Sequence, residues 1–174
     1  MMRTMIALLT PDYYLKNVLV LRPEALGQTG IRALLLDIDS TIVHYRSRAL
    51  LFGTEEWIKS LKQAGIGVCL VSNGPKKRVE QIALNLNIPF VCFAFKPLPF
   101  GFGRALRKMQ FDRASTACVG DQVFADVLAG HLAGIRTILV PPLAPEEEPW
   151  FTALKRPLER YVLRQTRQRP LEHF

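Results

Sequence analysis

Two carboxylates, Asp37 and Asp39, follow the apolar run Leu34-Leu35-Leu36. An apolar run of this kind is typical of a strand that is buried on both faces of a parallel sheet. Side chains at positions i and i+2 of a strand point the same way, so both carboxylates would emerge at the carboxyl end. Buried carboxylates are costly unless a cation or hydrogen bonds compensate them, which favours a metal-assisted site. The alternative is a strand-end turn built on local Asp and Ser hydrogen bonds.

Polar residues also follow the next three predicted strands, in chain order. They are Ser72, Lys96 and Asp121, with Asp126 five residues further on. The carboxyl ends of parallel strands meet at one edge of an open sheet, where ligands bind. This edge would gather carboxylates, a hydroxyl and an ammonium, a set of groups that suits phosphoryl transfer. Taken singly, Ser72 could instead cap a helix and Lys96 could be a surface lysine.

The elements that must position these residues alternate along the chain. Apolar runs expected to form strands occupy 31–38, 67–71, 89–95, 116–119 and 135–140. Segments of helical character occupy 54–64, 76–86, 99–109 and 122–132. This alternation predicts an α/β fold with three layers, in which helices cover both faces of a doubly wound, mostly parallel sheet. The intervals between the motifs leave no room for a cap domain.

Length and composition suit a single folded unit. The chain has 174 residues, of which 49% are hydrophobic, enough for a substantial core. We expect one domain over 1–149, including an N-terminal extension. A basic amphipathic tail over 150–174 follows, with its helix interrupted by Pro157. The oligomeric state stays open, since a second copy could cover the site.

The net charge of +8 predicts anionic partners, without choosing between nucleic acid, lipid head groups and acidic proteins. The basic clusters could also be solvated helix faces. Cys69, Cys92 and Cys118 lack metal-like spacing, so we expect buried free thiols in a reducing compartment. No apolar run approaches the roughly 20 residues that span a bilayer. We therefore expect a cytoplasmic location.

In chain order, these residues resemble the four motifs of the haloacid dehalogenase-like (HAD) phosphatases. The matching segments are Asp37-Ile38-Asp39-Ser40-Thr41, Ser72, Lys96 and Gly120-Asp121-Gln122-Val123-Phe124-Ala125-Asp126. The resemblance covers roughly residues 31–140 and implies a Rossmann-like HAD core. More narrowly, the first, second and fourth motifs look like the YqeG-type subgroup of HAD subfamily IIIA, related to the mitochondrial phosphatidylglycerophosphate phosphatases. Ser40 departs from the asparagine expected there, and we do not expect this to abolish the chemistry.

The resemblance implies a role for each catalytic position. Asp37 would be the nucleophile that forms an aspartyl-phosphate, and Asp39 would act as general acid and then as general base. Ser72 and Asn73 would bind phosphate oxygens, helped by backbone amides near the next helix N-terminus. Lys96 would neutralise charge on Asp37 and on the phosphate.

The resemblance also implies Mg²⁺ as the cofactor. Asp37, Asp121 and the main-chain carbonyl of Asp39 would bind the ion, and waters and phosphate would complete its shell. Asp126 and Thr41 would lie one layer behind these ligands. Oxygen donors without His or Cys favour Mg²⁺ over zinc. Taken alone, Gly120-Asp121 could be an ordinary turn.

A site without a cap suits a phosphate presented by something large. With cations such as Arg48 and Lys77 after the first two motifs, we predict hydrolysis of phosphatidylglycerophosphate. The partner would be an anionic phospholipid surface, with peripheral contact at the inner membrane face through the N-terminal segment and the tail.

Three alternatives remain. The enzyme could act on phosphorylated nucleic-acid ends or on a phosphoprotein, or the chain could be a non-catalytic binding scaffold with the same fold. Nucleic-acid binding would require exposed aromatic side chains for base stacking. We expect the candidates Phe93, Phe95, Phe100 and Phe102 to face the core, which disfavours nucleic acid.

Overall fold

The computed structural model describes residues 2–45, 48–148 and 150–166, and these form a single six-stranded sheet. The strand order is β1-β6-β5-β2-β3-β4, and every neighbouring pair is parallel. The strands are β1 (Tyr13–Tyr14), β2 (Ala33–Leu36), β3 (Gly67–Val71), β4 (Phe90–Val91), β5 (Thr116–Gly120) and β6 (Arg136–Leu139).

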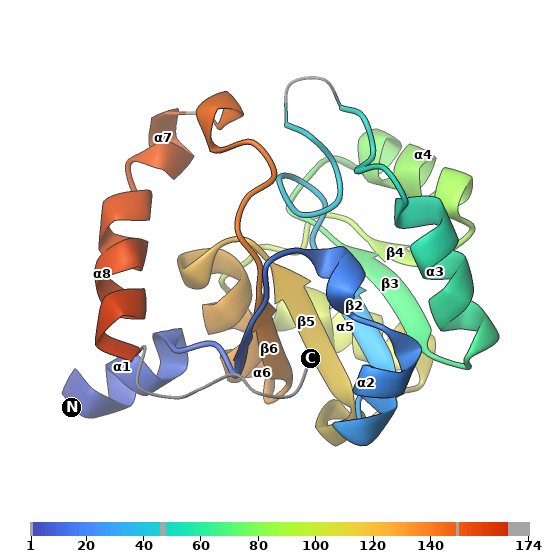
Figure 1. Cartoon of the computed structure of the whole chain (residues 1–174), viewed down its shortest axis with the longest axis horizontal. Coiled ribbons are helices and arrows are strands. Elements are labelled where there is room, and N and C mark those ends of the chain that lie inside the picture. The colour runs from blue at the N-terminus through green and yellow to red at the C-terminus, as the bar shows by residue number, and fades with distance from the viewer. Residues whose placement is uncertain (1, 46–47, 149, 167–174) are drawn as a thin grey trace.

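Helices precede, connect and follow these strands (Figure 1). The α-helices are α1 (Met2–Leu9), α2 (Pro23–Gln28), α3 (Thr54–Gln63), α4 (Lys76–Leu86), α5 (Phe100–Met109), α6 (Leu128–Ala133), α7 (Trp150–Ala153) and α8 (Arg156–Thr166). Short helical turns are η1 (Val18–Val20), η2 (Arg113–Ser115), the π-helical η3 (Val123–Val127) and η4 (Pro145–Glu147).

The central strand β2 shows how alternation divides the core between two helical layers. Leu34 and Leu36 point into a cluster with residues of α2, α3 and α4, whereas Leu35 points into a second cluster with residues of α5 and α6. All of β2 is buried, as its apolar run predicts. The predicted α/β fold with three layers is confirmed, and the described residues contain no cap domain.

The C-terminal segment packs on the domain along one side of the sheet (Figure 1). Val162 of α8 is buried with Val123, Val127 and Leu139, and Leu9 of α1 packs against the same cluster. The helical character of this segment is interrupted next to Pro157, where α7 ends at Ala153 and α8 begins at Arg156. Pro157 occupies the first turn of α8, where a missing backbone N–H removes no helical hydrogen bond. Residues 167–174 of the predicted tail lie outside the described residues.

The predicted strand over 89–95 contains only Phe90–Val91. The chain turns beyond it, because Phe93 and Phe95 adopt φ values of 46° and 57°. Strand alternation no longer holds there, and the expectation that these rings face the core is wrong. Phe93, Phe95 and Phe100 are 48%, 62% and 65% exposed, and of the four candidates only Phe102 is buried.

No helix in the described ranges is long and apolar enough to cross a membrane. All three cysteines are free thiols; Cys69 and Cys118 are buried, whereas Cys92 is partly exposed.

Candidate active site

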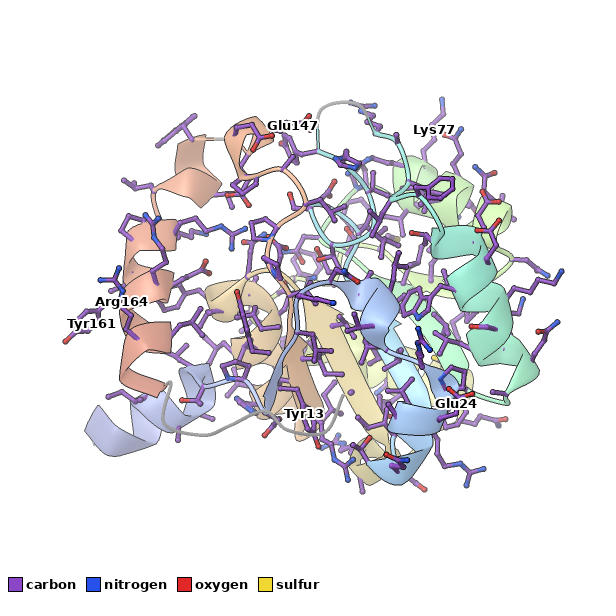
Figure 2. All side chains as sticks on the ribbon, viewed as in Figure 1. Tyr13, Glu24, Lys77, Glu147, Tyr161 and Arg164 are labelled. Carbon is purple, nitrogen blue, oxygen red and sulfur yellow. The ribbon has the colours of Figure 1, made fainter. Side chains whose placement is uncertain are left out.

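The predicted site residues lie at the carboxyl ends of the four strands that precede them. Asp37 directly follows β2, and its backbone N–H donates to Val119 of β5 at 2.9 Å. Ser72 and Asp121 directly follow β3 and β5, and Lys96 lies beyond β4. The parallel sheet therefore brings residues far apart in sequence to one rim, which is uppermost in Figure 2, where Lys77 and Glu147 are labelled.

Lys96 joins two buried carboxylates. Its Nζ lies 2.5 Å from an oxygen of Asp37 and 2.6 Å from an oxygen of Asp126, and its side chain is only 4% exposed. Burial disfavours the charged ammonium and acts to lower the pKa of Lys96. The carboxylates of Asp126 and Asp37 have the larger effect and raise this pKa. Burial raises the pKa of Asp37 to about 7, although Lys96 opposes this rise. Lys96 is thus a permanent cation beside the predicted nucleophile.

The side chain of Asn73 holds the loop that carries Lys96. Its Oδ1 accepts the backbone N–H of Lys96 at 2.8 Å, and its Nδ2 donates to the Lys96 carbonyl at 3.1 Å. Ser72 beside it is buried, and its Oγ accepts the backbone N–H of Gly74 at 3.0 Å. Asn73 is therefore in contact with Lys96, and Ser72 precedes Asn73 in the chain. The binding of phosphate by both residues stays a prediction.

Asp39 pairs with Arg78, a residue that the motifs did not single out. Arg78 donates to both carboxylate oxygens, with one contact at 2.8 Å, and this pairing raises the pKa of the guanidinium. Arg78 is the third residue of α4, so the sequence signal was its place in the Lys76-Lys77-Arg78 cluster. The Asp39 carboxylate is thus held by Arg78, and the acidic cluster found among the described residues is formed by other carboxylates.

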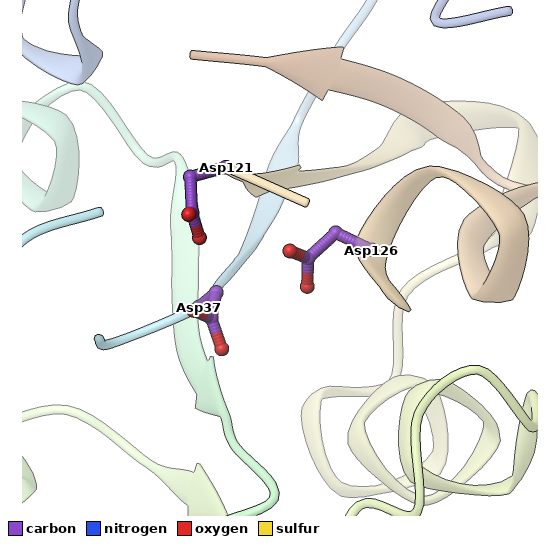
Figure 3. Close-up of side chains that lie close together, drawn as sticks. All are labelled: Asp37, Asp121 and Asp126. Atoms are coloured by element: carbon purple, nitrogen blue, oxygen red, sulfur yellow. The ribbon is translucent and has the colours of Figure 1, made fainter. Parts of the chain in front are cut away.

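Asp37, Asp121 and Asp126 form a buried acidic cluster (Figure 3). One carboxylate oxygen from each lies within 4.8 Å of the others. Thr41 is buried beside them and donates to Asp121 Oδ1 at 3.4 Å. Gly120 is required here, because a Cβ at that position would lie 2.1 Å from the carboxyl carbon of Asp126.

Arg156 at the start of α8 reaches the same cluster. One of its Nη atoms donates to the Asp121 carbonyl at 2.6 Å, and the other pairs with the Asp121 carboxylate. Glu148 and Glu159 hold the same guanidinium, each with one contact at 2.9 Å. Burial raises the pKa of Asp121 well above its usual range, and Arg156 opposes that rise. No sequence spacing pointed to this contact, since 35 residues separate the two partners.

Replacing Arg156 with methionine should destabilise the metal-free protein by about 3–5 kcal/mol. The substitution would leave Asp121, Glu148 and Glu159 buried without their shared cation. Urea unfolding in the presence of a chelator measures this effect, with the exposed Arg160→Met in the same helix as the matched control. Equal unfolding midpoints for the two variants would contradict the structural role of Arg156.

The acidic cluster fits a hard divalent cation. Asp37, Asp121, Asp126, Glu148 and Glu159 are all buried side chains, and Lys96 and Arg156 are the cations paired with them. Two cations against five carboxylates leave a negative excess in a site of low dielectric constant, which a divalent ion would offset. The three carboxylates of the cluster offer only oxygen ligands.

The doubly wound sheet with polar side chains at its strand ends is typical of an α/β enzyme that binds its ligand at this rim, and sequence comparison identifies the family. Residues 22–134 match the model of the haloacid dehalogenase-like hydrolases, so the chain belongs to that family. The chain is 35% identical over 153 residues to "Probable phosphatase YqeG" of Bacillus subtilis (strain 168), across 88% of each chain. A shorter match of 45 residues, 49% identical, links it to "Ribonucleotide monophosphatase NagD" of Escherichia coli K12, over 26% of this chain and 18% of that one.

Solved structures share the fold at low sequence identity. A hypothetical protein from Xanthomonas campestris aligns with a TM-score of 0.57 and 17% identity, over 85% of this chain and 90% of that chain. The cobalt-bound deoxy-D-mannose-octulosonate 8-phosphate phosphatase of Haemophilus influenzae aligns with a TM-score of 0.54 and 16% identity, over 83% and 92%. These likenesses support the same chain topology.

Proposed function

We propose that this protein is a Mg²⁺-dependent phosphomonoester hydrolase that acts through an aspartyl-phosphate on Asp37. The observation that carries the proposal is the contact of Lys96 with both Asp37 and Asp126, inside the cluster that Asp121 completes. The similarity to a probable phosphatase along 88% of the chain supports the same activity.

The reaction would take place in two displacements. A carboxylate oxygen of Asp37 forms a bond to phosphorus while the bond to the leaving oxygen breaks, and Asp39 gives that oxygen a proton. A water then attacks phosphorus, Asp39 takes its proton, and the bond to Asp37 breaks to release phosphate. Lys96 offsets the charge that develops on phosphoryl oxygens.

Arg78 would fix the position of the Asp39 side chain. Its bidentate contact holds both carboxylate oxygens of Asp39 at the start of α4. To give a proton to the leaving oxygen, Asp39 needs an oxygen within hydrogen-bond distance of it, so this contact would have to rearrange when substrate binds.

Asp37 and Asp121 would hold the Mg²⁺ ion, with the Asp39 main-chain carbonyl and with Asp126 close by. When bound, the ion would supply positive charge that orients the phosphoryl group. Oxygen donors without His or Cys in the described cluster favour Mg²⁺ over softer metals.

Phosphatidylglycerophosphate is the substrate that we favour. A site without a cap in the described part of the chain would admit a phosphate at a lipid surface. Three exposed rings, Phe93, Phe95 and Phe100, flank the loop of Lys96 and could enter the head-group region of a membrane. The net charge of +8 would favour anionic phospholipid and a peripheral location at the cytoplasmic face of the inner membrane.

The same exposed rings favour phosphorylated nucleic-acid ends as a second candidate. Aromatic side chains beside a basic surface can stack on unpaired bases. Because these rings lie in solvent, the argument against nucleic acid that rested on their burial no longer holds.

Phosphate release from phosphatidylglycerophosphate in mixed micelles should depend on Mg²⁺ and stop when a chelator removes the ion. A soluble aryl phosphate and a 5′-phosphorylated oligonucleotide are the comparison substrates. Efficient release from the lipid alone supports the preferred substrate. Release from the oligonucleotide but not from the lipid would replace it, and a failure to hydrolyse all three would reject phosphatase activity on these classes.

A further inference from the structure

A pocket of about 520 Å³ opens between the segment after the first motif and α4, and Arg78, which pairs with Asp39, lines it. Val43 and Leu50 line one wall, and Ile82 of α4 lines another. Apolar walls lower the local dielectric constant and strengthen the field of any charge within them. The pocket is therefore a place where a few charged side chains can select a ligand.

The charged residues that line this pocket are all cations. They are Arg48, Lys77 and Arg78, and the lining includes no carboxylate among the described residues. Arg78 already contacts Asp39, whereas Arg48 and Lys77 are exposed and have no ion pair in the described part of the chain. Two cations without a counter-charge in a concave site are suited to an anionic group of a ligand.

The pocket lies on the side of the site that the leaving group must occupy. Asp39, as the general acid, has to be within hydrogen-bond distance of the leaving oxygen. Arg78 binds Asp39 and also lines the pocket, so the pocket begins where the leaving group would emerge. The nucleophile and the acidic cluster would hold the phosphoryl group being transferred, and the pocket would take the part that departs.

We infer that Arg48 and Lys77 bind a second phosphoryl group carried by the leaving group of the substrate. The inference rests on the proposed phosphatase function, because it uses the role of Asp39. It assigns the enzyme to substrates with two phosphates on one short polyol, as in the head group of phosphatidylglycerophosphate, where glycerol links a phosphodiester to the terminal phosphate. The apolar walls would contact the carbon atoms between the two phosphates.

Equilibrium binding to the Asp37→Asn variant tests the pocket without turnover. Glycerol 1,3-bisphosphate and glycerol 3-phosphate are titrated in the presence of Mg²⁺, so that the two probes differ only in the second phosphate. We expect the bisphosphate to bind at least about tenfold more tightly. Adding Lys77→Gln should reduce that preference by roughly tenfold, because a charged contact to the second phosphate is lost.

Lys76→Gln is the matched control, because Lys76 is the exposed neighbour of Lys77 and does not line the pocket. It should leave the preference unchanged. Equal binding of the two glycerol esters, or an equal effect of Lys76→Gln and Lys77→Gln, would overturn the inference. A nucleoside 3′,5′-bisphosphate that binds more tightly than the glycerol compound would overturn the lipid head group as the source of the second phosphate.

Turnover by the wild-type protein separates failure of this inference from failure of the proposed function. Hydrolysis of both glycerol esters with the same kcat/KM would support the phosphatase and reject the pocket. Binding of the bisphosphate that depends on Lys77, without hydrolysis by the wild type, would support the pocket and reject the phosphatase.

Discussion

Asp37→Asn should lower phosphate release by at least about a thousandfold, because an amide cannot attack phosphorus or form the aspartyl-phosphate. Release from a soluble aryl phosphate at saturating Mg²⁺ measures the effect, and it requires no knowledge of the natural substrate. Turnover near that of the wild type would contradict the assignment of Asp37 as nucleophile. It would imply that another carboxylate of the cluster attacks phosphorus.

The same variant should keep its fold. Burial raises the pKa of Asp37 to about 7, above its unfolded value, so the folded protein binds this proton more tightly than the unfolded chain. The contribution is present at low pH and is lost as pH rises through about 7 in the metal-free protein. Asparagine does not titrate, so the unfolding free energy of Asp37→Asn without metal should exceed that of the wild type at pH 8. A lower value would mean that the Lys96 contact outweighs the cost of burying the charge.

Lys96→Met should both abolish turnover and destabilise the metal-free protein, by about 3–5 kcal/mol. Methionine has a similar length but leaves Asp37 and Asp126 buried without their cation. Urea unfolding at pH 8 in a chelator measures the stability. The loss should shrink at pH 5, because burial raises the pKa of Asp37 to about 7 and this carboxylate can then take up a proton.

The exposed Lys59→Met in α3 is the control for loss of a lysine charge. Its stability should lie within about 0.5 kcal/mol of the wild type. If Lys96→Met unfolds at the same urea concentration as this control, the ion pairs of Lys96 do not stabilise the fold. If it also retains turnover, the proposed role of Lys96 beside the nucleophile is wrong.

The sequence by itself determined the central sheet and the order of the motif residues. The run Leu34-Leu35-Leu36 predicts a strand buried on both faces, and β2 is such a strand because Leu35 faces one helical layer while its neighbours face the other. The alternation of strands and helices predicts a parallel sheet, which brings Asp37 and Asp121 to one rim because each directly follows a strand.

Only the tertiary structure determined which cationic side chains pair with which carboxylates. Arg78 contacts Asp39 because α4 starts beside the first motif, and Arg156 contacts Asp121 because α8 packs on the cluster around Val162. Neither contact follows from a spacing in the chain, because each depends on how a helix is placed against the sheet. The exposure of Phe93 also depends on the tertiary structure. Its backbone adopts a left-handed conformation, so the alternation of side-chain directions along the strand does not continue to this residue. Periodicity predicts the direction of a side chain only while the regular element continues.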